Sequence, residues 1–158
     1  MARYTASSYD DYLCLRPPLL LWLSVLYYSR AIALPIVMAM GRFAGVNNNA
    51  IQLLRGLWSL QTLIPSLIAA AILYAMFQRV PTAPRPVRWV WAHGRLLLTL
   101  SAVIDLSLVG ISLLRLDEQN SQMLPLLAAG ALDAYFLLYI LTARRVRDTF
   151  AHFPAVAR

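Results

Sequence analysis

Three ionisable residues lie inside long apolar stretches of the sequence, where charged side chains are rare. Arg30 falls near the middle of the first stretch, Asp105 near the middle of the third and Asp133 near the middle of the fourth. Ionisable residues inside a membrane span usually face the interior of a helix bundle and pair with one another. One arginine fork can also bind two carboxylates. We therefore expect an internal cluster of these three residues, in which one aspartate can hold a proton.

The sequence leaves three roles open for this cluster. It can be a buried ion pair that sets the register of the helices, a site that moves protons or binds a polar ligand, or a contact for the membrane helix of a partner. Small and hydroxyl residues recur at helical spacing beside it and would let helices approach and hydrogen-bond. The hydroxyl residues are Ser59, Thr62 and Ser66 in the second stretch and Ser101 and Ser112 in the third.

The remaining candidates for chemistry are weaker. Cys14 is the only cysteine, which excludes an internal disulfide and any multi-cysteine metal site. Neither His93 nor His152 has a second metal ligand at a recognised spacing, and no P-loop, dinucleotide fingerprint or nucleophile elbow is present. We therefore expect no enzymatic activity, no cofactor and no metal. A lipid-active enzyme would have to use the region of His93 and Arg95.

The composition argues for a membrane protein. The chain has 158 residues, of which 60% are hydrophobic and only 13% are charged, and its mean hydropathy is +0.62. A soluble domain carries about 25% charged residues, and too few polar residues remain here to cover the outer faces of four soluble helices. The net charge is +7 and all 14 basic residues are arginine. Because the arginines are separated by long apolar runs, we expect no nucleic-acid partner.

Four stretches have the length of a membrane span, which needs about 20 mostly apolar residues. A central charge costs about 2.5–3.5 kcal/mol on the insertion scale, and each Leu, Ile, Val or Phe returns about 0.3–0.6 kcal/mol. The third stretch holds eight Leu, two Val and two Ile and therefore inserts despite Asp105. The prediction is an all-α integral membrane four-helix bundle over residues 18–143, after a polar segment 1–17 and before a basic tail 144–158. Its helices are predicted at 18–41, 56–78, 96–114 and 123–143.

The arginines predict the orientation of these spans. Ten fall on the side of the two termini and three on the other side, which favours cytoplasmic termini. Those predicted to meet lipid headgroups or to set topology are Arg85, Arg88, Arg144, Arg145 and Arg147. Residues 79–95 contain three prolines and are predicted to form an extended loop. Pro35 and Pro65 are predicted to kink their helices.

Several short motifs carry a family resemblance. They are Tyr9-Asp10, Leu15-Arg16-Pro17-Pro18, Leu21-Trp22-Leu23, Tyr28-Ser29-Arg30, the run from Asp133 to Leu138, and Arg144-Arg145-Val146-Arg147-Asp148. Over nearly the whole chain the sequence resembles the YfeZ-like bacterial inner-membrane proteins. The resemblance implies a multi-pass protein of the bacterial inner membrane, with Arg30 and Asp133 as family features and with nothing catalytic.

Two functions are therefore expected. The leading expectation is a non-enzymatic accessory or scaffold subunit, surrounded by membrane lipids and associated with itself or with a larger membrane protein. The alternative is a small oligomeric transporter or proton-linked conduit that uses Arg30, Asp105 and Asp133 at the membrane midplane.

Overall fold

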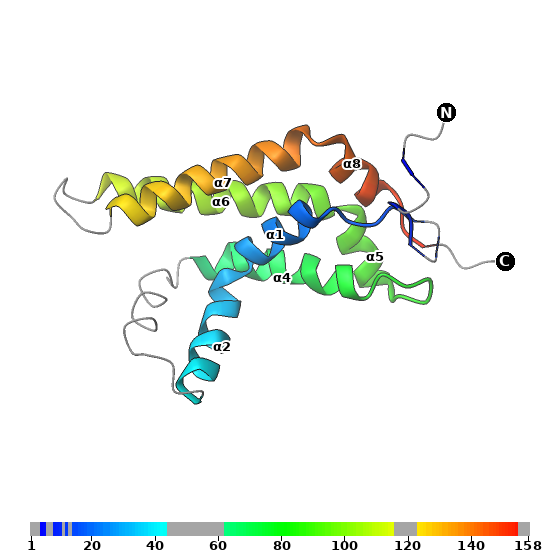
Figure 1. The fold of residues 1–158 in the computed structure, drawn as a ribbon, viewed down its shortest axis with the longest axis horizontal. Coiled ribbons are helices and arrows are strands. Elements are labelled where there is room, and N and C mark those ends of the chain that lie inside the picture. The colour runs from blue at the N-terminus through cyan, green and yellow to red at the C-terminus, as the bar shows by residue number, and fades with distance from the viewer. Residues whose placement is uncertain are drawn as a thin grey trace.

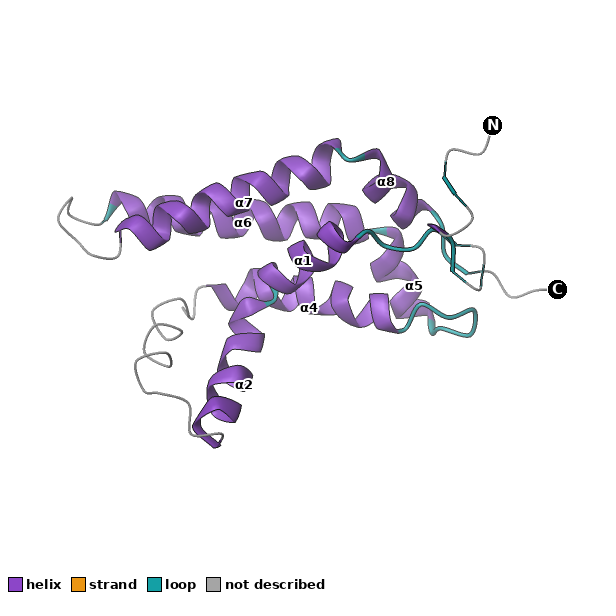
Figure 2. Ribbon diagram, viewed as in Figure 1, coloured by secondary structure: helices purple, strands orange, loops and turns teal. Residues whose placement is uncertain are grey.

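The protein folds as a set of helices. The computed structural model describes residues 4–5, 8–10, 12, 14–43, 62–115 and 123–154. This part of the chain holds seven helices and no sheet, which confirms the all-helical class (Figure 2). In chain order they are α1 (Leu19–Tyr28), α2 (Arg30–Phe43), α4 (Leu63–Phe77), α5 (Arg85–Ala92), α6 (Gly94–Leu114), α7 (Met123–Thr142) and α8 (Arg144–Ala151).

Helices α6 and α7 form the long axis of the molecule (Figure 1). They have 21 and 20 residues, and both are long enough and apolar enough to cross a membrane. At 1.5 Å per residue each covers about 30 Å, the thickness of the hydrocarbon core. The helices approach closely at Gly130, where an added Cβ would lie 3.3 Å from Val109 Cγ1.

Helices α1 and α2 differ from the single kinked span predicted over 18–41. The chain bends by 79° between them, so the pair is either one broken span or a re-entrant segment. The 79° bend lies at Ser29, whereas Pro35 falls inside α2. Proline removes one backbone hydrogen bond, whereas the real break is stabilised by contacts from another helix, described below. Helix α2 therefore leaves the bundle (Figure 1).

Helix α4 begins later than the predicted second span. It starts at Leu63, and residues 56–61 of that predicted span lie outside the described residues. Pro65 is the third residue of the helix, where the backbone N–H has no partner within the helix. Proline is tolerated there, so Pro65 opens α4 instead of kinking its middle.

Helices α5 and α8 lie together at one end of the bundle, near both termini (Figure 1). The prediction of an extended loop over residues 79–95 is wrong, because this segment contains α5. Pro84 is the N-cap residue of α5, and Pro86 lies within the first turn of the helix. Proline fits those positions. Both short helices are amphipathic, and they bury Trp91 and Phe150, whose rings lie 4.9 Å apart.

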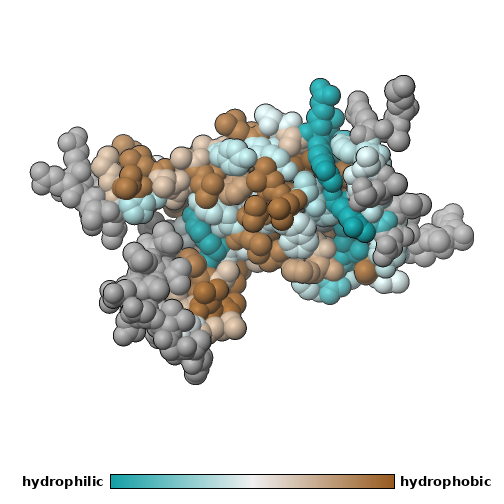
Figure 3. All heavy atoms as spheres, viewed as in Figure 1, coloured by the Kyte–Doolittle hydropathy of each residue, from teal (hydrophilic) through white to brown (hydrophobic). Residues whose placement is uncertain are grey.

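Apolar side chains lie both inside the bundle and on its surface. The buried core combines aliphatic side chains of α1, α4, α6 and α7 with the aromatic rings of the short helices. Large apolar side chains are also exposed, including Leu19 at 76%, Leu114 at 89% and Leu124 at 77% (Figure 3). Two helices, or three if the bent pair is one span, could cross a bilayer by length and composition. The fold is therefore that expected of a membrane protein.

Candidate functional site

The break between α1 and α2 exposes backbone groups that a side chain from α4 satisfies. Ser66 Oγ donates to the carbonyl of Tyr28 at 2.7 Å and accepts from the amide of Ala31 at 3.2 Å. Ser29 Oγ donates to the carbonyl of Leu26 at 2.9 Å. Unpaired backbone groups are costly in an apolar interior. Ser66 therefore allows the chain to bend at this depth.

Arg30, the first residue of α2, faces α6 at this break. Its Nη1 lies 2.7 Å from Asp105 Oδ2, and the exposed fractions of the two side chains are 18% and 2%. The guanidinium Cζ also lies 4.3 Å from the centroid of the Tyr27 ring. Nη1 donates to the Tyr27 carbonyl at 3.4 Å. The predicted pairing of Arg30 with Asp105 therefore joins the start of α2 to α6. Arg30 is the more exposed partner of this pair.

Asp133 of α7 completes the cluster without an ion pair of its own. The residue is fully buried, and its carboxyl group interacts with the Asp105 carboxyl group and with the Tyr27 hydroxyl group. Its side chain lies within electrostatic range of both Asp105 and Arg30. Two carboxylates and one guanidinium carry one uncompensated negative charge. Because a buried net charge is strongly disfavoured, a proton bound between the two carboxyl groups makes the site neutral.

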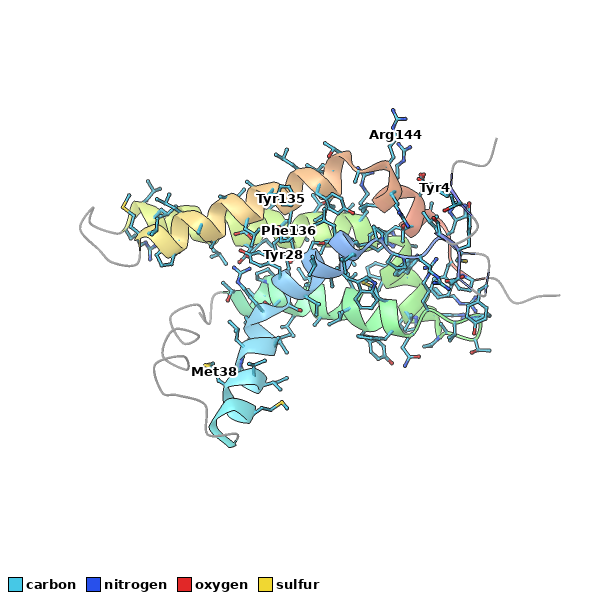
Figure 4. All side chains as sticks on the ribbon, viewed as in Figure 1. Tyr4, Tyr28, Met38, Tyr135, Phe136 and Arg144 are labelled. Carbon is cyan, nitrogen blue, oxygen red and sulfur yellow. The ribbon has the colours of Figure 1, made fainter. Side chains whose placement is uncertain are left out.

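Three aromatic rings adjoin the cluster, and the sequence analysis missed them. Tyr28 donates to the carbonyl of Asp133 at 3.2 Å, and Tyr27 donates to the carbonyl of Ala129 at 3.2 Å. The ring of Phe136 lies 5.3 Å from Tyr27 and 6.3 Å from Tyr28 (Figure 4). These contacts tie α1 to α7 beside the charges. The adjacent tyrosines immediately before Ser29 and Arg30 were the available signal.

The predicted hydroxyl residues have different partners. Ser66 spans the break, and Ser101 Oγ of α6 donates to the carbonyl of Pro65 in α4 at 2.9 Å. Ser112 Oγ instead donates to Leu108 within its own helix at 2.8 Å. Thr62 is the N-cap residue of α4, and Ser59 lies outside the described residues. Two of these hydroxyls therefore join α4 to its neighbours near the cluster.

The arginines predicted to meet lipid headgroups lie on α5 and α8. Arg85, Arg144 and Arg147 are exposed, and Arg144 points away from the bundle in Figure 4. Arg88 is exposed as well, but its guanidinium donates to the carbonyls of Pro81 and Ala83. The guanidinium of Arg145 is 6.0 Å from the centroid of the Tyr4 ring.

A second buried arginine, Arg79, was not identified as a site residue from the sequence. Its guanidinium donates to the carbonyls of Leu15 at 2.9 Å and His152 at 3.3 Å and lies 4.8 Å from the Trp91 ring centroid. The carboxylate of Asp10 is 3.7 Å away. Arg79 thereby joins the N-terminal segment, α5 and the segment after α8 at one end of the bundle.

Cys14 lies buried in the segment that Arg79 holds in place. Burial is the largest influence on its thiol and raises the pKa, while the nearby Arg79 guanidinium acts in the opposite direction. No group of three or more His, Cys, Asp or Glu side chains in the described residues could hold a metal ion. The described chemistry is therefore centred on the α1–α2 break.

Comparison with known proteins gives one match. Residues 4–152 match the model of a family described as "Protein of unknown function (DUF2919)". No curated protein and no solved structure matches the chain. The matched segment includes the α1–α2 break, both aspartates and the short helices α5 and α8. The chain therefore belongs to the DUF2919 family.

Proposed function

We propose that the protein is a multi-pass protein of a bacterial inner membrane, akin to the YfeZ-like proteins that its sequence resembles. It crosses the membrane four times with both termini in the cytoplasm. Support comes from the length of α6 and α7 and from the exposed leucines around them. Both termini and the basic helices α5 and α8 lie at one end of the bundle (Figure 1), which agrees with the excess of arginine on that side.

Within that membrane the protein acts as a proton-linked conduit or transporter, and Asp133 is the observation that carries this proposal. The Arg30–Asp105 pair alone is enough to set the register of the helices. Asp133 adds a second buried carboxyl group that forms no ion pair with a described residue, which a purely structural pair does not need. Groups of this kind cost stability and are kept where they have a function.

Proton binding at the two aspartates is the elementary step. A proton bound by Asp133 or Asp105 neutralises the cluster, and its release restores one negative charge beside Arg30. The broken helix supports this role, because discontinuous membrane helices commonly form ion sites near the midplane. Arg30 is the member of the cluster whose side chain is partly exposed, at 18%.

Proton flux into liposomes tests the proposal. The purified protein is reconstituted with a pH-sensitive dye inside, and a pH gradient or a potassium diffusion potential is applied. The wild type should acidify or alkalinise the lumen faster than protein-free liposomes, and Asp133→Asn should lose that flux while keeping its helicity. Asp148→Asn, which changes a carboxylate of α8, is the matched control. Wild-type flux equal to that of protein-free liposomes under both gradients would overturn the proposal.

A second candidate is the non-enzymatic accessory or scaffold subunit, and the position of α2 favours it. This helix is bent by 79° relative to α1, and its exposed side chains include Ile36, Val37 and Met40. Such an arm fits a contact with a larger membrane protein or with a second copy of the chain. Neither candidate requires a cofactor.

Native mass spectrometry of protein extracted gently from its own membrane tests the accessory role. A stoichiometric partner or homo-oligomer is expected, and Val37→Trp on α2 should weaken it. Leu127→Trp is the control, because Leu127 is an exposed leucine on α7. A monomer, or an assembly that Val37→Trp leaves unchanged, would count against α2 as the contact.

A further inference from the structure

A groove runs along the outer face of α6 near the end that carries α5 and α8. Its volume is about 610 Å³, and its lining residues are Ala92, His93, Arg95, Leu96, Thr99, Leu100, Val103 and Leu141. Leu96, Leu100 and Val103 follow one another at helical spacing and are exposed by 65%, 45% and 45%. They form a continuous apolar floor on one side of the helix.

The basic side chains of the groove lie at one end only. His93 and Arg95 are at the start of α6, and no lining residue is acidic. Arg95 donates from Nε to the carbonyl of Ile140 at 3.3 Å and from Nη2 to that of Leu141 at 2.8 Å. Because a guanidinium has five N–H groups, three remain for a ligand. The groove thus has a cationic head and an apolar body.

Arg95 is also fixed by hydrogen bonds to a neighbouring helix. Its two hydrogen bonds to the last carbonyls of α7 hold the guanidinium at the mouth of the groove. Arg144 and Arg147, in contrast, are exposed. A fixed cation loses less conformational entropy when it binds an anion. Trp89, exposed by 58% and with its ring 4.7 Å from that of His93, lies next to the same mouth.

We propose that this groove binds one anionic phospholipid. The phosphate lies against Arg95 and His93, and one acyl chain follows Leu96, Leu100 and Val103. Charge complementarity and the apolar floor identify the occupant, because a free phosphate would leave the floor uncovered. Basic pockets between membrane helices on the cytoplasmic side are known places for lipid headgroups, and tryptophan is enriched at that depth. The inference rests on the proposed membrane location but not on proton conduction.

Lipid retention in detergent tests the site. The full-length protein is held in neutral micelles doped with phosphatidylglycerol or phosphatidylcholine, and native mass spectrometry counts the lipids bound to each chain. The wild type should retain one phosphatidylglycerol in clear preference to phosphatidylcholine. Loss of a charged hydrogen bond predicts about tenfold weaker retention in Arg95→Gln.

Two further variants separate lipid binding from damage to the fold. Arg95→Gln also removes bonds to α7, so Leu100→Trp is made to fill the groove while leaving Arg95 in place. It should lose the lipid to a similar extent, whereas Arg144→Gln, the charge-matched control on α8, should retain it. Equal retention of the two lipids, or retention unchanged in both groove variants, would overturn the proposal. Displacement of the lipid by millimolar inorganic phosphate would identify a free-phosphate site and also overturn it.

A failure of the lipid-groove proposal can be distinguished from a failure of the proposed function. Fractionation of alkali-washed membranes tests the membrane location on its own. Liposome flux tests proton conduction and does not depend on Arg95. A protein that conducts protons but shows no lipid preference would remove only the groove proposal.

Discussion

Arg30 and Arg79 are both withdrawn from the surface, but they are stabilised in different ways. Arg30 lies at the centre of the bundle and is balanced by the carboxylate of Asp105 at 2.7 Å. Arg79, only 8% exposed, lies at the end of the bundle, where its closest partners are the carbonyls of Leu15 and His152. Arg30 has a carboxylate on another helix in direct contact. Arg79 is bound mainly by peptide carbonyls and the face of an indole ring, and its carboxylate partner, Asp10, is farther away at 3.7 Å.

The difference shows which property of arginine stabilises each region, its charge or its hydrogen-bond donors. At the centre, the surrounding apolar side chains make a counter-charge for Arg30 necessary. Asp105 supplies that charge, and the nearby Asp133 interacts electrostatically with both residues. At the end, the five donors of the guanidinium are more important than its charge, because three chain segments converge there. The central region is therefore a site of charge balance, and the end region is a hydrogen-bonded joint.

The largest effect is expected from Arg30→Leu. The substitution leaves Asp105 and Asp133 buried without a cation, and loss of one partner of a buried pair costs about 3–5 kcal/mol. Denaturant unfolding in mixed micelles measures the loss. The double variant Arg30→Leu with Asp105→Leu should recover part of it, since a single buried carboxyl group then remains and a proton can neutralise it. If the double variant is no more stable than Arg30→Leu, the ion pair does not balance the centre.

A smaller effect is expected from Arg79→Ala. The variant removes hydrogen bonds from a charged donor to two carbonyls, and such bonds contribute about 1.5–3 kcal/mol. The N-terminal segment should then be cleaved faster by added protease, while proton flux at the central site is retained. Arg85→Ala is the control, because Arg85 is an exposed arginine on neighbouring α5. Unchanged cleavage would show that Arg79 does not hold the segment in place.

Ser66→Ala tests how much the backbone hydrogen bonds at the α1–α2 break contribute to the stability of the central region. It leaves the carbonyl of Tyr28 and the amide of Ala31 without their side-chain partner, at a cost of about 1–3 kcal/mol. Ser107→Ala is the matched control, because that exposed hydroxyl bonds only within its own helix. Equal stability of the two variants, measured by thermal unfolding, would contradict the role of Ser66 at the break.

The smallest expected effect is on the rate at which Cys14 reacts. This prediction concerns that rate and not the free energy of unfolding. Burial raises the pKa of its thiol, and only the thiolate reacts with maleimide. At a given pH below that pKa, the folded protein therefore holds less thiolate than a free cysteine, and labelling should be slow at pH 7 and rise with pH. In Arg79→Ala, release of the segment should accelerate labelling at pH 7. Equal labelling rates would show that the segment stays packed without Arg79.

The longest helices and the meeting of Arg30 with Asp105 could be predicted from the sequence because both follow from the apolar runs. Apolar runs of about 20 residues indicated α6 and α7 closely, and Arg30, Asp105 and Asp133 followed from their positions within such runs. The contact between Arg30 and Asp105 was expected from the same argument.

The break, the short helices and the joint at Arg79 depend on contacts between distant segments. The bend at Ser29 is stabilised by Ser66, 37 residues later, whereas proline statistics favoured Pro35. The prolines near α5 are typical of loops, yet they occupy the first positions of a helix. Arg79 looked like a surface arginine because its partners come from both ends of the chain.

The ion pair across the bend also has a consequence for biosynthesis. Arg30 precedes Asp105 by 75 residues, and a ribosome needs about 4–15 s to add that length at about 5–20 residues per second. During that interval the arginine has no carboxylate from α6, and the ten residues of α1 are too short to cross the bilayer alone. In the proposed membrane location, the ion pair that holds α2 against α6 therefore forms only after the third apolar stretch has left the ribosome.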